Sequence, residues 1–320
     1  MSKAAKGWLI TAAVLVAAGF FLFLLVIWGF AGDFTKALVK YEMNEYTISE
    51  SYQNITLVTD TADVVFVPSE NGTSSVVCYE PKNAEHAVSV KDGTLFIELI
   101  DTRKWYEHLR INFRTPQITV SVPRGEYGLL SVKGSTGDVE MPKAFTFEKA
   151  TVALSTGDVE FSAAVLEELA VKTTTGEIDV ENANVGVLDV LASTGEITVG
   201  NVSCEGDAKI RVTTGEIELE NLKCHNLAVN ADTGSVVLER VVADKNFSIM
   251  TNTGDVNFDR ADAGEIFVKT STGHVKGTLL SEKVFITKTD TGRIDVPKTT
   301  SGGKCEIVTD TGDIKVSIKQ

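Results

Sequence analysis

The chain of 320 residues is poor in the residues that build disulfide frameworks, zinc sites and nucleic-acid-binding surfaces. Its four cysteines, Cys78, Cys204, Cys224 and Cys305, are too widely spaced for a close-spaced zinc motif or a disulfide scaffold. Basic side chains are also scarce, with 30 Lys and Arg against 44 Asp and Glu. This excess of negative charge makes nucleic acid and anionic head groups poor partners, whereas cations and basic polymers suit it better.

Charge is absent from one long run near the N-terminus. Trp8 to Phe30 carries no charged residue and, at 1.5 Å per residue, is long enough to cross a hydrocarbon core of about 30 Å. Lys3 and Lys6 precede the run, so the positive-inside rule predicts a single-pass membrane anchor, a cytoplasmic N-terminus and an extracytoplasmic C-terminal domain. A cleaved signal peptide is the alternative, because Gly29 and Ala31 are small residues in a cleavage-like arrangement. The length of the run favours the uncleaved anchor.

Insertions are absent from a short phrase that recurs ten times in the rest of the chain. Each copy has a Thr-Gly core, and successive glycines are 19 or 20 residues apart. These predicted structural turns are Gly137, Gly157, Gly176, Gly195, Gly215, Gly234, Gly254, Gly273, Gly292 and Gly312. A repeat this even is typical of a solenoid, in which each unit leans on its neighbours.

Apolar residues alternate with polar ones on both sides of each glycine. The position two residues after the glycine is apolar in every copy, from Val139 to Ile314, and the position five residues before it is apolar in nearly all copies. Period-two alternation predicts strands with one buried face, and a unit of this length is too short for two strands and a helix. The fold class is therefore all-β: a single parallel β-solenoid (β-helix) of about ten coils, behind one N-terminal transmembrane helix. At about 4.8 Å per coil, its length would be on the order of 48 Å.

Four segments follow from these patterns. Residues 1–32 are a cytoplasmic stub and anchor, 33–47 a juxtamembrane linker or short helix, 48–128 an irregular β region that caps the solenoid, and 129–320 the repeat solenoid. Within the cap, Thr61-Ala62-Asp63-Val64 resembles a decayed copy of the repeat phrase. The last copy, at Gly312, is followed by so few residues that the far end is expected to lack a cap, and either to be blunted by Lys315 and Lys319 or to meet a partner or a second copy.

Carboxylates recur directly after the repeat glycines, so stacking would form an acidic ladder. Its first members are Asp138, Asp158, Glu177, Glu196 and Glu216. Like charges about 4.8 Å apart repel, and a bound cation such as Ca²⁺ would relieve that repulsion. The glycine-rich phrase of calcium-binding β-rolls is absent, however, and His274 and Arg293 interrupt the series. We therefore expect mainly a solvated acidic edge, with weak cation binding as the alternative, and we predict no metal site and no cofactor.

Catalytic constellations are also missing. Asp232, Asp290 and Asp310 each begin the Asp-Thr-Gly phrase of aspartic proteases, but Ser, Thr or Asn replaces the Asp in the other seven copies, as a turn tolerates and a catalytic dyad does not. Cys204 and Cys224 should stack one coil apart, either as small buried residues or as a disulfide. The cluster Trp105-Tyr106-Glu107-His108 offers aromatic and charged groups to a sugar or lipid, or packs on its own domain. No catalytic residue is predicted.

The serial corners, together with Asp60-Thr61-Ala62-Asp63-Val64, Ile118 to Pro123 and Gly134 to Val139, resemble the bacterial putative adhesin family of unknown function, related to toastrack-type cell-envelope domains. The resemblance covers about residues 45–320. It implies a β-solenoid at the bacterial surface and brings no catalytic residues with it. Ala62, His274 and Arg293 depart from the repeat pattern.

Three functions remain to be weighed. The first is a non-enzymatic adhesion, scaffold or envelope-sensing module whose partners are the membrane and a cell-wall polymer or envelope protein. The second is a polysaccharide lyase or hydrolase, which the unvarying spacing disfavours because it leaves no long loops to build a cleft. The third is a self-assembling surface scaffold, since exposed coil ends can add edge to edge.

Overall fold

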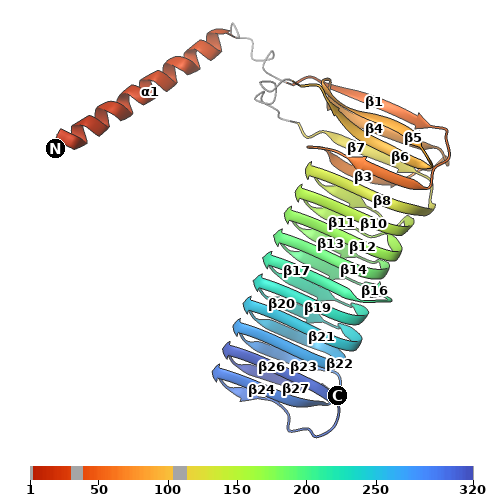
Figure 1. Ribbon diagram of the computed structural model, residues 1–320, viewed down its shortest axis with the longest axis vertical. Coiled ribbons are helices and arrows are strands. Elements are labelled where there is room, and N and C mark those ends of the chain that lie inside the picture. Colours follow the sequence, from red (N-terminus) through yellow and green to blue (C-terminus); the bar gives the residue numbers. More distant parts are fainter. Residues whose placement is uncertain (1–2, 30–38, 104–113, 320) are drawn as a thin grey trace.

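The computed structural model describes residues 3–29, 39–103 and 114–319, and shows one helix followed by a long stack of β-coils (Figure 1). Helix α1 spans Lys3–Gly29, and its segment Lys6–Leu25 has a mean hydropathy of 2.5. That length and composition make it a candidate membrane span, by a criterion that signal sequences also meet.

Each coil contributes to both of two parallel sheets, and in one coil the longer strand is interrupted. The long-strand sheet contains β8 (Gly125–Thr136), β10 (Phe145–Thr156), β12 (Ala164–Thr175), β14 (Asn184–Thr194), β16 (Ser203–Cys204), β17 (Ala208–Thr214), β19 (Lys223–Thr233), β21 (Val242–Thr253), β24 (Lys283–Thr291) and β26 (Gly303–Thr311). The short-strand sheet contains β9 (Val139–Met141), β11 (Val159–Phe161), β13 (Ile178–Glu181), β15 (Ile197–Gly200), β18 (Ile217–Glu220), β20 (Val236–Glu239), β23 (Val275–Leu279), β25 (Ile294–Asp295) and β27 (Ile314–Ile318). Strand β22 (Val256–Thr272) runs through both sheets. The predicted parallel β-solenoid of about ten coils is confirmed.

The apolar columns form the core between the two sheets. Val159 pairs in register with Val139 on one side and with Ile178 on the other, and all three side chains are buried. The same register continues along the stack, so identical positions of successive coils lie on top of one another. A single hydrophobic cluster runs from Ile48 to Val316. Cap and solenoid therefore share one core.

The cap begins with two further coils. One consists of β2 (Asn54–Val58) and β3 (Asp63–Pro68), which pair with β8 and β9, so the decayed copy at Ala62 is a true coil. The other consists of β6 (Thr94–Asp101) and β7 (Gln117–Val122), stacked outside the first. Its later sequence position but outer location means that the coil order in space differs from the order in the chain.

Antiparallel strands then cover this end. β5 (Ala84–Lys91) pairs with β6, β4 (Ser74–Pro81) pairs with β7, and β1 (Tyr41–Ile48) pairs with β4. The prediction of a helix or linker over 33–47 is therefore wrong for β1, whose alternation is weak because much of the strand is exposed. The predicted boundary at 128 also falls inside β8.

The far end is a second departure from chain order. β26 pairs with β22 on one side and with β24 on the other, and β27 likewise lies between β23 and β25. The C-terminal coil is therefore inserted between two earlier coils, and the coil of β24 and β25 is outermost (Figure 1). The expectation that the copy at Gly312 forms the end is wrong, because similar coils compete for the same edge and the sequence period does not rank them.

The glycine corners bring successive backbones very close together. Eight of the ten repeat glycines have φ between +123° and +153°, and Gly273 and Gly292 are the two that do not. A Cβ on any of the ten would come within about 2.4 Å of a backbone oxygen of the adjacent coil. Ala62 is tolerated at its corner because it does not adopt a positive φ. Glycine is thus required by close stacking as well as by backbone conformation.

A second corner lies on the opposite edge and was not foreseen from the sequence. Five residues there have φ between +51° and +54°: Asn182, Asn201, Asn221, Arg240 and Arg260. The Asn221 amide donates to Asn201 Oδ1 at 2.8 Å, and the Asn201 amide donates to Asn182 Oδ1 at 3.4 Å. Asparagine tolerates the left-handed region, so this amide ladder stabilises the turn that leads into each new coil.

Candidate binding surfaces

The acidic ladder is a real column of stacked residues. Asp138, Asp158, Glu177, Glu196 and Glu216 stand immediately before short strands that are paired in register, from Val139 to Ile217. A second acidic column lies two residues further along each strand, where Glu140, Glu160 and Asp179 are in register. The outer face of the short-strand sheet is therefore strongly negative over its first five repeat coils. We call these two columns the acidic face.

The first carboxylates of the ladder are engaged by the backbone. The N–H of Asp158 donates to Asp138 Oδ1 at 2.8 Å, and the N–H of Glu177 donates to Asp158 Oδ1 at 2.7 Å. Asp63 in the cap accepts from the N–H of Asp138 in the same way, at 3.1 Å. These side chains satisfy amides at the corner, so their repetition has a structural cause that does not require a cation.

The interruptions of the ladder follow the same logic. Asp255 Oδ1 accepts from the N–H of His274, His274 Nδ1 accepts from the N–H of Asp313, and Asp313 Oδ1 accepts from the N–H of Arg293. His274 thus substitutes for a carboxylate by using an unprotonated ring nitrogen as the acceptor. These hydrogen bonds link Asp255 to His274, His274 to Asp313 and Asp313 to Arg293. They therefore follow the order of the distal coils in space and not the order of the residues in the chain.

Crowding raises the pKa of acids on this face. Repulsion from Asp179 is the largest cause for Glu177, followed by desolvation and by repulsion from Glu196, Asp158 and Glu160. Desolvation is the largest cause for Glu196, followed by repulsion from its acidic neighbours, and desolvation also leads for Asp179. A raised pKa means that the folded state opposes ionisation, so the charged face destabilises the fold slightly.

We expect Glu177→Gln to stabilise the protein at neutral pH by less than about 1 kcal/mol, since Glu177 is exposed and solvent screens the repulsion. The folded-state pKa is raised, so the penalty is fully present above that pKa and disappears as pH falls below the ordinary value of about 4.3. Urea unfolding at several pH values and salt concentrations measures the gain. Glu148→Gln, at an exposed acid of the long-strand sheet, is the control; an equal gain there would contradict the crowding argument.

A buried polar cluster lies in the cap and was missed from the sequence. His86 Nδ1 lies 2.6 Å from Glu80 Oε2, and His86 Nε2 lies 3.1 Å from Thr59 Oγ1. The Asn44 amide donates to Glu80 Oε1 at 2.8 Å, and the backbone N–H of His86 donates to Glu80 Oε2 at 2.9 Å. Thr59, Glu80 and His86 are each at most 6% exposed. Alternation within β4, which places Cys78 and Glu80 on one face, is the only sequence signal for it.

This cluster is the one group of three or more metal-ligand residues that converges within the described ranges. Single ligand atoms of Cys78, Glu80 and His86 lie within 4.8 Å of one another. Burial, and then the neighbouring Glu80 carboxylate, raise the pKa of the Cys78 thiol to about 12. A thiol this weakly acidic is a poor nucleophile, and both ring nitrogens of His86 already have partners. The geometry is that of a hydrogen-bonded core network.

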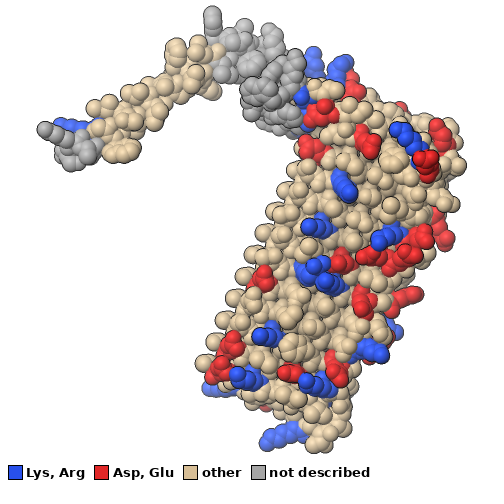
Figure 2. Space-filling model, viewed as in Figure 1, with Lys and Arg blue, Asp and Glu red and all other residues tan. Residues whose placement is uncertain are grey.

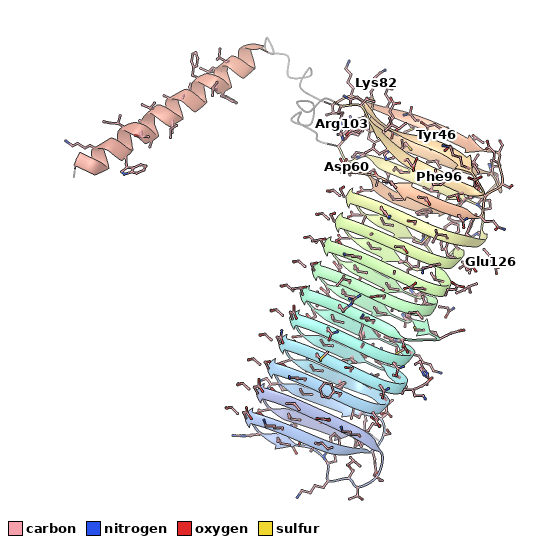
Figure 3. All side chains as sticks on the ribbon, viewed as in Figure 1. Tyr46, Asp60, Lys82, Phe96, Arg103 and Glu126 are labelled. Carbon is pink, nitrogen blue, oxygen red and sulfur yellow. The ribbon has the colours of Figure 1, made fainter. Side chains whose placement is uncertain are left out.

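The space beside this cluster is narrow. A small hollow is lined by Thr59, Asp60, Glu80, His86 and Arg103 among others. Arg103, which Figure 3 labels together with Asp60 at the corner of the cap, forms ion pairs with Asp101 at 2.6 Å and with Asp60 at 3.6 Å. The His86 and Thr59 side chains thus lie behind a charged corner and are too enclosed to receive a polymer.

The remaining predicted sites take simple structural roles. All four cysteines are buried and unbridged, so the prediction of small buried residues at Cys204 and Cys224 is confirmed. Burial raises the pKa of the Cys224 thiol to about 12. Asp232, Asp290 and Asp310 are exposed corner residues. The cluster Trp105-Tyr106-Glu107-His108 lies outside the described residues. Figure 2 shows acidic and basic side chains interspersed on the solenoid face in view.

Comparisons with known proteins identify a family and solved structures to which this chain is similar. The model of the family described as Toastrack DUF4097 matches residues 52–220 and 207–320. A putative adhesin from Parabacteroides distasonis, of known crystal structure, is similar at a TM-score of 0.50 and 12% identity, over 87% of this chain and 97% of that one. A structure described as a putative lipid binding protein from the same species has a TM-score of 0.47 at 18% identity, over 87% and 98% of the two chains. Among proteins with curated descriptions, none matches.

Proposed function

This chain belongs to the Toastrack DUF4097 family, and we propose that it is a membrane-anchored, extracytoplasmic β-solenoid that acts as a non-enzymatic adhesive or scaffolding module of the cell envelope. The apolar helix α1 would be its single-pass anchor, with Lys3 and Lys6 on the cytoplasmic side. A solenoid whose coils rest directly on one another suits this role, because it presents a long and stiff surface.

The acidic face is the observation that carries the proposal. Carboxylates repeated from coil to coil form a linear array, which matches a partner with regularly spaced positive groups or a bridging cation. The evenly short corners between Gly137 and Gly273 add no loops around this array, so an extended partner can lie along it. A polysaccharide lyase or hydrolase, the alternative function, would need a cleft built from long loops, and we do not propose it.

Binding of the full-length chain in nanodiscs to isolated cell-wall material, and to polylysine as a basic probe, tests the role of this face. The test variant replaces Asp138 and Asp158 by Asn, and Glu177, Glu196 and Glu216 by Gln, which keeps an oxygen for each backbone amide. We expect its affinity to fall at least tenfold, since several charge contacts are lost together. Adding Ca²⁺ to the wild type reports whether a cation bridges the array.

The matched control neutralises five exposed acids elsewhere: Glu148, Glu167, Glu205, Asp244 and Glu265. The total charge change is identical, so equal losses in both variants would indicate a bulk charge effect and contradict a specific face. Saturable binding that neither variant weakens would transfer the adhesive surface to another part of the molecule. Absence of binding to the wall material, with or without Ca²⁺, would overturn the adhesive role.

A further inference from the structure

The two ends of the solenoid differ in whether further strands cover the outermost coil. At the cap, the antiparallel strands β5, β4 and β1 cover the outermost coil. At the distal end, β24 pairs with β26 on one side only, and no other described strand pairs with its outer edge. A nine-residue strand thus presents a row of backbone N–H and C=O groups that lack strand partners. Such edges recruit another strand unless they are blunted.

The charged side chains that usually protect an edge strand from pairing give β24 little protection. Lys283, at its start, is turned inward and forms a buried ion pair with Asp262, so it does not protect the edge. The outward-facing positions that follow are Val284, 37% exposed, and Ile286, 52% exposed. On the adjacent β26 the corresponding residues are Lys304 and Glu306. At these two positions the outermost strand therefore carries apolar residues where the strand beside it carries charged ones.

Other apolar groups gather at the same end. Leu280 and Ile294 are 45% and 47% exposed, and Phe285 and Val296 pack against the last layer of the core while remaining partly exposed. An open core layer beside an open strand edge is a surface that a further β-layer would complete. The surface is small, so one contact alone would be weak compared with a standard interface of about 1,600 Å².

The charge pattern of this edge is self-complementary, so the edge of one copy matches the same edge of a second copy. Outward-facing positions along and just before β24 read Glu282, Val284, Ile286, Lys288 and Asp290, so an acid and a base flank two apolar residues. Within one copy Glu282 accepts from Ser301 Oγ at 2.5 Å, and Lys288 Nζ lies 3.3 Å from Asp290 Oδ1. In an antiparallel pair centred on Phe285, Glu282 of one copy lies opposite Lys288 of the other, and Val284 lies opposite Ile286, twice each by symmetry. Opposite charges and apolar pairs across strands are both favourable. A two-fold axis generates such self-complementary contacts without a second surface.

From this register we infer that the distal edge of β24 is a homophilic docking site, which pairs antiparallel with β24 of a second copy. The two solenoids would join end to end, with their caps at the far ends of the combined rod. The inference deepens the proposed adhesive function, and rests on its anchor, because anchors at opposite ends place the two copies in facing membranes. Many weak contacts between two such membranes would then act together through multivalency.

Clustering of vesicles that carry the full-length chain tests this directly. Light scattering should show that wild-type vesicles cluster and that Ile286→Lys vesicles do not, with at least a tenfold loss in clustering rate. Leu166→Lys is the matched control, since Leu166 is 62% exposed on the long-strand sheet far from the distal end. Circular dichroism of each variant establishes that the fold is retained, because a surface change on the last coil should leave the other coils intact.

A charge exchange tests the register. Glu282→Lys or Lys288→Glu alone places like charges opposite each other and should reduce clustering, whereas the double exchange should restore it, because each copy again presents a complementary pair. Clustering that survives Ile286→Lys, or a double exchange that remains as poor as the single changes, would overturn the docking site. Vesicles that never cluster would overturn it too, while the cell-wall binding experiment would still decide the adhesive role independently.

Discussion

Replacing Gly215 by alanine should destabilise the protein by at least about 4 kcal/mol, near the upper limit for a single substitution. Its φ of +147° is one that residues with a Cβ rarely adopt, and the added Cβ would lie 1.8 Å from the carbonyl oxygen of Gly195. Neither group can move away, because the N–H of Gly195 donates to Thr214 and the N–H of Gly215 donates to Thr233 at 2.9 Å. Urea unfolding of the full chain measures the loss.

Gly200→Ala is the matched control within the preceding coil. Gly200 lies in β15 without a positive φ, and a Cβ there would meet nothing closer than a side-chain atom at 3.7 Å. Its replacement should change stability by less than about 1 kcal/mol. Similar losses for both variants would show that the glycine corner does not depend on close backbone approach. Hydrogen exchange should place the damage in coils next to Gly215, since each coil contacts only its neighbours.

The second large effect is expected at the buried ion pair of the distal end. Lys283 Nζ lies 2.6 Å from Asp262 Oδ1, and the two side chains are 3% and 19% exposed. Asp262→Ala would leave the ammonium group buried without its counter-charge, at a cost of about 3–5 kcal/mol. Because the damage concerns the last coils, hydrogen exchange of β24 and β26 measures it more directly than global unfolding does.

The double variant Asp262→Ala, Lys283→Met distinguishes the effect of an unpaired buried charge from the effect of the alanine substitution itself. Replacing both partners by apolar groups removes the unpaired charge, so most of the lost protection should return. If the double variant were as unprotected as Asp262→Ala, the damage would come from the alanine itself and not from an isolated ammonium group. Methionine keeps much of the length of the lysine side chain, which limits the cavity that the change would create.

This ion pair spans the inserted C-terminal coil. Lys283 belongs to the outermost coil and Asp262 to the coil two layers inward, with Gly303 of β26 between them. Gly303 has no side chain, and a Cβ there would lie 1.8 Å from the carbonyl oxygen of Gly264, so the backbones of β26 and β22 approach each other closely beside the lysine. The pair fastens the outer coil to the body of the solenoid, on the side where the chain leaves regular pairing.

The parts of the structure that are built from repeated residues could be predicted from the sequence, whereas the parts that depend on single residues could not. The spacing of glycines such as Gly157 and the column from Val139 to Ile314 were enough to predict strands, sheet faces and a parallel stack, because each position is tested ten times. The order of the last coils was not predictable in this way, since β24 and β26 both offer a suitable register to β22. The observed order contains contacts between single residues, such as the Lys283–Asp262 ion pair, that no repeat predicts.

The candidate sites show the same difference between repeated residues and residues that occur once. The acidic ladder was visible because it follows the glycines, although its backbone hydrogen bonds need the corner geometry to be seen. The cluster of Thr59, Glu80 and His86 joins single residues of β4, β5 and the first corner, which no period connects. The apolar edge of β24 was hidden for a different reason: Val284 and Ile286 look like ordinary strand residues until the stack is known to end there.

Insertion of the C-terminal coil between earlier ones has a consequence for synthesis. A ribosome delivers β24 before β26, so the outermost layer must wait, unpaired or provisionally paired with β22, until the final strands arrive and take the place between them. The distal end therefore cannot mature by simple addition of layers as the chain emerges. In the same way, a premature stop codon after Asp295 would remove an internal layer of the stack, not its tip.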